Sequence, residues 1–281
     1  MAIPVRSRSH FDAQDVLETG GGGARAVNDG WLNRALGVAD GVGLSIGAQT
    51  PMILRGDAPT TSWAPGSRVG ADDRIASLVQ DLYVDDPLLG DSLARGLAAG
   101  ALADAAMTGD PLRRGDPAGL GRAVAGLMSG EAGADIVALS LDGWDTHAQQ
   151  GLLISARLTA LDGLLDGLRS GLGPAWADTV VVVATEFGRT VRVNGTRGTD
   201  HGTASSLLLA GGALRPGGLV GDWPTLAEGR LYEDRDLAPT LDVRSVFKTV
   251  LRDHIGLERA ALDGRVFPGS AAEAPPLQGL V

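Results

Sequence analysis

The chain has 281 residues, 44% of them hydrophobic, which is enough for the core of one sizeable α/β domain. Its formal net charge of −10 argues against nucleic acid as a partner, because binding phosphates needs a surface rich in Lys and Arg. The absence of cysteine excludes Cys-based zinc sites, Cys nucleophiles and iron–sulfur clusters. No run approaches the ~20 apolar residues that cross a bilayer, so we expect no membrane span, and the first residues lack a secretory signal.

The first half of the chain is predicted to be largely helical. The expected elements are a helix over 12–21 with Asp12 as cap and Gly20 as stop, a helix over 24–39, a strand and turn over 41–56, a Pro-, Ser- and Thr-rich loop over 57–70, and an Ala- and Leu-rich helical insert over about 71–131 that is broken near 108–119. The insert is the expected subdomain or lid.

From residue 134 onward, strands alternate with helices. The expected elements are strands over 134–141, 179–185, 204–210 and 217–221, and helices over 148–170 and 242–255. Such alternation is typical of a mostly parallel sheet with helices on both faces. We therefore predict a single α/β domain over 1–281.

Two of the predicted strands end abruptly in polar residues. The run ADIVALSL is followed by DGWDTH (142–147), which brings Asp145 and His147 to a strand end, where open α/β sheets bind ligands. Two residues apart, these side chains can converge on one ion from the same side. The alternative is an Asp that caps the next helix and a surface His.

The second apolar run, at 180–184, is followed by Glu186 and then by a Gly-rich loop that carries Asp200 and His201. Glycine permits turns that aim such side chains inward. Two alternatives stay open: Glu186 forms a salt bridge with Arg189, or Arg189 binds an anionic substrate through its planar fork. A mixture of Asp, Glu and His suits a divalent transition metal better than calcium.

A third candidate segment lies near the N-terminus. Ser9 and His10 stand just before a predicted helix start, where backbone amides favour anions, so a nucleophile or an oxyanion site could be built there. Equally, Ser9 could only cap the helix. His254, on the last predicted helix, is expected to be an ordinary helix residue.

Five ordered motifs resemble a large bacterial family, domain of unknown function 1501 (DUF1501), which is itself related to the alkaline phosphatase and sulfatase superfamily. The motifs are RSHFDAQD (8–15), DGWDTH (142–147), TEFGRT (185–190), GTDHGT (198–203) and VFPG (266–269). The resemblance implies an α/β sandwich with a central, mostly parallel sheet and a metal-assisted hydrolase site at the strand ends.

By the same resemblance, Asp145 and His147 look like the Asp and His ligands of one metal, and His201 looks like the His that precedes a strand. Glu186 takes the place of an Asp ligand of a second metal, but Phe187 follows where the superfamily often has His. The second metal is therefore expected to be altered or absent. Counting back from Thr19-Gly20 puts the superfamily's nucleophile position at His10, beside Ser9.

Members of the family usually begin with a twin-arginine export signal and a first strand that carries an Asp ligand, and this chain starts after both. We therefore expect an N-terminally shortened version of an exported or periplasmic protein, or a cytoplasmic one if this start is the natural one.

These inferences predict a metal-dependent hydrolase of phosphate or sulfate esters. The expected ligands of a divalent Zn, Mn, Fe, Ca or Mg ion are Asp145, His147, Glu186, Asp200 and His201, and the expected catalytic residues are Ser9, His10 and Arg189. The substrate would be a small anionic ester or a sulfated or phosphorylated polymer. The alternative is a non-catalytic scaffold that binds a structural ion, a partner or a polysaccharide. The oligomeric state stays open.

Overall fold

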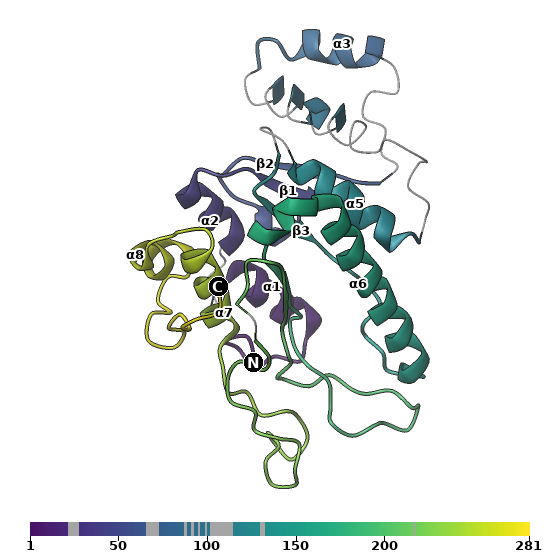
Figure 1. Ribbon diagram of the computed structural model, residues 1–281, viewed down its shortest axis with the longest axis vertical. Helices are drawn as coiled ribbons and strands as arrows, with labels where there is room; N and C mark the ends of the chain where they lie inside the picture. The colour runs from purple at the N-terminus through teal and green to yellow at the C-terminus, as the bar shows by residue number, and fades with distance from the viewer. Residues whose placement is uncertain are drawn as a thin grey trace.

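The fold was described from a computed structural model of the chain (Figure 1). The structure describes residues 1–21, 28–65, 73–86, 89–90, 93–94, 96–98, 100–101, 115–129, 133–215 and 217–281.

A three-stranded parallel sheet forms the centre of the fold, in the order β2-β1-β3. Its strands are β1 (Gly43–Ile46), β2 (Thr60–Trp63) and β3 (Ile136–Leu139). β2 lies in the stretch that was predicted to be a loop, so that prediction was wrong. Prolines on both sides hide this four-residue strand in the sequence, yet it pairs fully with β1 and its Trp63 is buried in the core.

Helices cover both faces of this sheet, as predicted. On one face lie α2 (Trp31–Ala39) and α7 (Val243–Asp253), and on the other lie α5 (Pro117–Met128) and α6 (Gln150–Leu172) (Figure 1). The alternation of side chains along β3 explains the two layers: Ile136 and Ala138 pack against the core cluster that includes α2 and α7, whereas Val137 packs against α5. Helices α5 and α6, which come directly before and after β3 in the chain, therefore lie on the same face.

A second sheet corrects the expectation of one mostly parallel sheet. β4 (Val181–Val183) and β5 (Leu208–Ala210) pair antiparallel and share no ladder with β3 among the described residues. β4 nevertheless lies between the same two helical layers as β3, because Val181 packs against the α5–α6 cluster and Val182 against the opposite one. No strand forms over 217–221, which was also predicted wrongly.

The helix boundaries differ from the predictions at several points. Helix α1 (His10–Thr19) begins two residues before Asp12, so Ser9 rather than Asp12 occupies the N-cap position. Gly20 does end this helix, with a left-handed φ of 68°, and a Cβ there would lie 2.7 Å from the Phe267 ring. Helix α2 begins at Trp31 rather than at residue 24, and residues 24–27 of the predicted helix lie outside the described part.

The predicted helical insert is described only in part. Helix α3 (Asp73–Leu82) and α5 are helical as expected, and residues 102–114 lie outside the described part. The predicted break does not extend to 117–119, because Asp116 caps α5 through the Gly119 N–H and Pro117 suits the first helical turn. The remaining short elements are η1 (Met52–Leu54), η2 (Gly173–Asp178), α8 (Arg259–Ala261) and η3 (Leu262–Val266).

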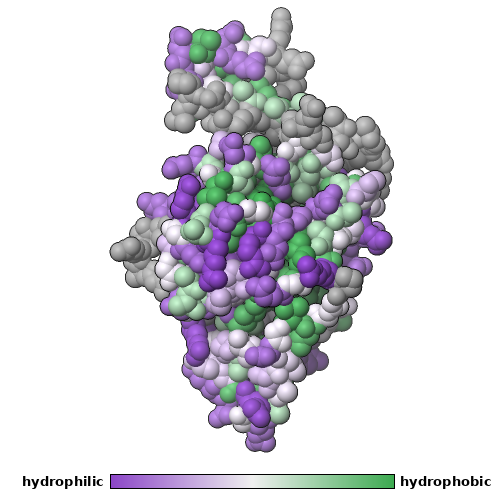
Figure 2. Space-filling view, turned by 60° about the vertical axis from the view of Figure 1, so that its left-hand side comes forward, coloured by the Kyte–Doolittle hydropathy of each residue, from purple (hydrophilic) through white to green (hydrophobic). Residues whose placement is uncertain are grey.

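No helix in the described part of the chain is both long and apolar enough to cross a membrane. On the face drawn in Figure 2, hydrophilic residues gather over the middle of the molecule, with hydrophobic residues among them in small groups.

A buried ion pair joins α7 to η3. The Lys248 side chain has no exposed surface, and its Nζ donates to Asp263 Oδ1 at 2.5 Å and to the Ser270 carbonyl at 3.2 Å. Burial raises the pKa of Asp263, but the hydrogen bonds from Lys248 and Arg259 outweigh that effect and hold this pKa below its usual value. Among the described residues, Asp263 is therefore the one carboxylate that pairs with Lys248.

We predict that Asp263→Asn lowers the free energy of unfolding by about 3–5 kcal/mol, because it leaves the buried Lys248 ammonium without its counter-charge. Urea unfolding at neutral pH would measure this. Asp162→Asn, which changes an exposed carboxylate on α6, is the matched control and should change stability little.

The same pair predicts a dependence on pH. Because the folded-state pKa of Asp263 is depressed, its contribution to stability is fully present above the unfolded pKa of ~3.9 and is lost as the pH falls through the folded value. The difference in the free energy of unfolding between the wild type and Asp263→Asn should therefore become smaller in acid. An equal difference at pH 6 and pH 3 would contradict this assignment.

Candidate metal centre

Three segments that are far apart in the sequence meet at one place. His10 is the first residue of α1, Asp145 and His147 follow β3, and His201 lies in the loop between β4 and β5. Glu186, three residues after β4, joins them through His10. The loops that follow β3 and β4, together with the start of α1, thus supply every side chain of the cluster.

The Asp145 carboxylate lies at the centre of this cluster. Its Oδ1 is 2.9 Å from His147 Nε2 and 3.0 Å from His201 Nε2, and its Oδ2 is 3.3 Å from His10 Nε2. The Nε2 atoms of His147 and His201 are 3.0 Å apart. Three imidazoles therefore present the same ring nitrogen to one carboxylate.

The opposite ring nitrogen of each imidazole faces an acceptor. His10 Nδ1 lies 2.6 Å from Glu186 Oε1, His201 Nδ1 lies 2.8 Å from the Arg8 carbonyl oxygen, and His147 Nδ1 lies 3.4 Å from an oxygen of Asp200. A carbonyl or an ionised carboxylate only accepts hydrogen bonds, so a ring that carries its proton on Nδ1 donates to its outer acceptor. In that tautomer, the Nε2 lone pair points inward.

This arrangement has the donor atoms and the support that a metal centre needs. One ligand atom each from His10, Asp145 and His201 lie within 4.8 Å of one another, and His147 adjoins them. Two ligand atoms at ~2.0–2.1 Å from one tetrahedral ion lie ~3.3 Å apart, close to the separations observed here. Metal-binding imidazoles almost always donate their other N–H to a carboxylate or carbonyl, and the Nδ1 atoms of these three rings face such acceptors.

Buried Phe187 supports the rings from below. Its ring centroid lies 4.8 Å from that of His10 and 4.7 Å from that of His201. Two neighbouring residues thus contact the same ring: Glu186 bonds to His10 Nδ1, and Phe187 packs against the face of the imidazole.

Arg189 fastens Asp145 to the loop that carries His201. Its Nη1 donates to Asp145 Oδ1 at 2.5 Å, its Nε donates to Thr199 Oγ1 at 3.1 Å, and its Nη2 donates to the Thr199 carbonyl. Arg189 therefore lies against Asp145 rather than Glu186. Three of its N–H donors are thus bonded within the protein, and they join Asp145 to the loop that carries His201.

Buried polar groups join the two loops behind the centre. Gln150 Oε1 accepts from Thr146 Oγ1 at 2.9 Å and from Thr199 Oγ1 at 2.5 Å. The Gly198 backbone passes so close to His147 that a Cβ would lie 2.1 Å from its carbonyl, which only glycine permits. These contacts hold His147 and His201 in register.

The surroundings of Asp145 stabilise its charge. Burial raises the pKa of this carboxyl, but the hydrogen bond from Arg189, together with the contacts of His201, His147 and His10, outweighs burial and lowers the pKa to about 2. Asp145 is consequently an anion at neutral pH, as a metal ligand must be.

The predicted site residues therefore occupy different positions in the cluster. His10, Asp145, His147 and His201 face one another, whereas Glu186 and Asp200 contact the outward nitrogens of His10 and His147. Ser9 lies at the N-cap of α1, and its side chain makes no capping bond. His254 ends α7, apart from the cluster. Sequence reasoning missed the Arg8 carbonyl, because a backbone acceptor leaves no mark in residue identity.

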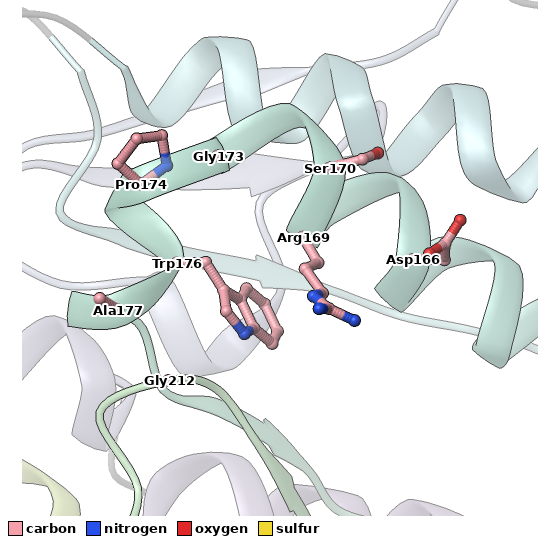
Figure 3. A pocket seen from close by; sticks show the side chains of 8 residues that line it. All are labelled: Asp166, Arg169, Ser170, Gly173, Pro174, Trp176, Ala177 and Gly212. Atoms are coloured by element: carbon pink, nitrogen blue, oxygen red, sulfur yellow. The ribbon is translucent and has the colours of Figure 1, made fainter.

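A separate hollow lies away from the histidines and has a different lining. It has a volume of about 630 Å³, and Figure 3 shows Trp176 and Arg169 pointing into the same space beside η2. Gly212, just after β5, closes its other side, so the hollow lies at the end of the second sheet opposite to the histidines. No cluster of metal-binding side chains was found there among the described residues.

Comparisons with known proteins agree with the motifs that form the centre. Searches of curated proteins and of solved structures found no match. The family model described as "Protein of unknown function (DUF1501)" matches residues 1–267, nearly the whole chain and all three segments of the centre. The chain therefore belongs to the DUF1501 family.

Proposed function

We propose that the protein is a metal-dependent hydrolase of phosphate or sulfate esters, and that His10, Asp145, His147 and His201 hold its ion. The observation that carries this proposal is the orientation of the three imidazoles: each directs Nε2 at Asp145 and Nδ1 at an acceptor. A set of three nitrogens and one carboxylate suits Zn, Mn or Fe.

The exposure of the centre supports a catalytic use. The side chains of His10, Asp145 and His147 are 39%, 42% and 46% exposed, so solvent and a substrate can reach the donor atoms. Catalytic metal sites keep a position open for water or substrate, whereas structural sites are closed. The relationship to alkaline phosphatases and sulfatases, inferred from the motifs, supplies the ester as the substrate class.

The residues around the donors have separate tasks in this proposal. A bound divalent ion would polarise an ester oxygen and lower the pKa of a water molecule. Glu186 and Asp200 keep His10 and His147 in the orientation that leaves Nε2 free, and Arg189 holds Asp145 in place. Ser9 lies beside His10 and is the candidate nucleophile, because its side chain makes no capping bond to α1.

One observation favours the alternative of a non-catalytic scaffold. Both strands behind the centre, β3 and β4, are only partly buried, although their sequences IVAL and VVV are fully apolar. Catalytic groups usually act in a site that excludes water, where electrostatic interactions are strong. A bound ion could then serve to hold loops or a partner, without turnover.

We predict that His201→Ala abolishes stable metal binding. The protein would be loaded with Zn or Mn, dialysed and analysed for bound metal, with His254→Ala as the matched control because His254 lies outside the cluster. The wild type and the control should retain about one ion per chain, because the cluster offers one set of ligand atoms. Equal metal content in all three proteins would refute the proposed centre.

Glu186→Gln is predicted to weaken metal binding by roughly 10- to 100-fold without abolishing it, the usual effect of losing a hydrogen-bond partner of a ligand. The reason is that Glu186 contacts His10 Nδ1 and orients the ring. Metal affinity would be measured by competition with a chelator of known affinity. Complete loss would instead identify Glu186 as a direct ligand, which is the role that the sequence suggested.

Turnover separates the two functions. We predict that the metal-loaded protein hydrolyses at least one of an aryl phosphate, an aryl phosphodiester and an aryl sulfate, and that Asp145→Ala shows no activity above the metal-free protein. Release of the aryl alcohol would be followed by absorbance. Metal binding without any metal-dependent release from the three esters would favour the scaffold.

A further inference from the structure

Arg157 lies on α6 beside the loop that leads to Asp145. Its guanidinium covers the backbone of Gly143: a Cβ at residue 143 would lie 2.5 Å from Arg157 Nε and 2.6 Å from Cζ and Nη2. Gly143 has a φ of 90°, a conformation that favours glycine. The absence of a side chain at 143 thus makes room for the guanidinium, two residues before Asp145.

The start of α6 is fixed to the centre on the same face. Gln150 accepts hydrogen bonds from Thr146 and Thr199, one in each of the two loops that carry the ligands. Arg157 follows Gln150 by seven residues, which is two helical turns and returns to the same side of the helix. The contact with Gly143 is therefore a consequence of how α6 is anchored.

Arg157 differs from the other arginines near the centre because its donors are free. Arg189 is bound to Asp145 and Thr199, Arg8 is bound to Glu233 and Asp236, and Arg235 donates to the His201 carbonyl. In the described part of the chain, no hydrogen bond or ion pair engages the Arg157 side chain, which is exposed. Five N–H donors remain for a ligand.

We infer that Arg157 binds the oxyanion group of a ligand at the metal centre. This inference rests on the proposed metal centre. A planar guanidinium matches two oxygens of a tetrahedral oxyanion and forms charge-assisted hydrogen bonds with them. Because the chain carries a net charge of −10, a cation beside the centre would help to attract an anion.

The test measures binding of inorganic phosphate and of sulfate to the metal-loaded protein by isothermal titration calorimetry, together with the metal content of each variant. Arg157→Gln should weaken phosphate binding roughly tenfold while metal content stays unchanged, because one charged hydrogen-bonding group is lost. Arg157→Lys should recover part of the affinity. Arg169→Gln is the matched control, since Arg169 is an exposed arginine at the other end of the same helix.

The outcomes distinguish the two levels of the argument. If the wild type binds metal and Arg157→Gln binds both anions as tightly as the wild type, the role of Arg157 is refuted and the metal centre stands. A loss of metal together with phosphate would show that Arg157 only maintains the loop, which also overturns the inference. A wild type that binds no metal refutes both proposals.

Discussion

The candidate centre depends on the carboxylate of Asp145. Three imidazoles and one guanidinium, from a helix start and two loops, contact its two oxygens. The Arg189 bond to Asp145 offsets part of the repulsion between the carboxylate and inward nitrogen lone pairs. The same arginine bonds to Thr199, so the position of His201 and the charge of Asp145 are set by one side chain.

The strands bring the loops of the centre to one place, but they do little to hold those loops rigid. β3 and β4 are short and partly buried, and they belong to separate ladders, so the strands alone would leave their loops free to move. The loops are instead held to each other. Gln150 joins Thr146 to Thr199, and the glycine at 198 lets two backbones touch. A centre built in this way does not need one continuous sheet, because its geometry is fixed by contacts among the loops.

The sequence predicted which residues meet, since Asp, Glu and His after apolar runs mark strand ends whatever the pairing of the strands. It did not predict their arrangement. Whether Glu186 faces an ion or His10 depends on a few ångströms of loop conformation, and both positions need the same residue type. The antiparallel pairing of β4 with β5 escaped for a related reason: an apolar run indicates burial but not direction, and direction is decided by the long loop that brings β5 back. β2 escaped because prolines on both sides of Thr60–Trp63 are also typical of a loop.

The spacing of the inward nitrogens fits a metal ion better than protons as the partner of this cluster. His147 Nε2 and His201 Nε2 are 3.0 Å apart, and both lie within 3.0 Å of the same Asp145 oxygen. One proton can join one pair of these atoms, but the third atom then faces them with its own lone pair. Protonating both rings puts two cationic N–H groups against each other. A single divalent ion accepts lone pairs from all of these atoms at once, and the outward acceptors already hold the rings in the form that such an ion requires. The arrangement of the Nδ1 partners is therefore stronger evidence for a metal centre than the number of histidines or acidic residues.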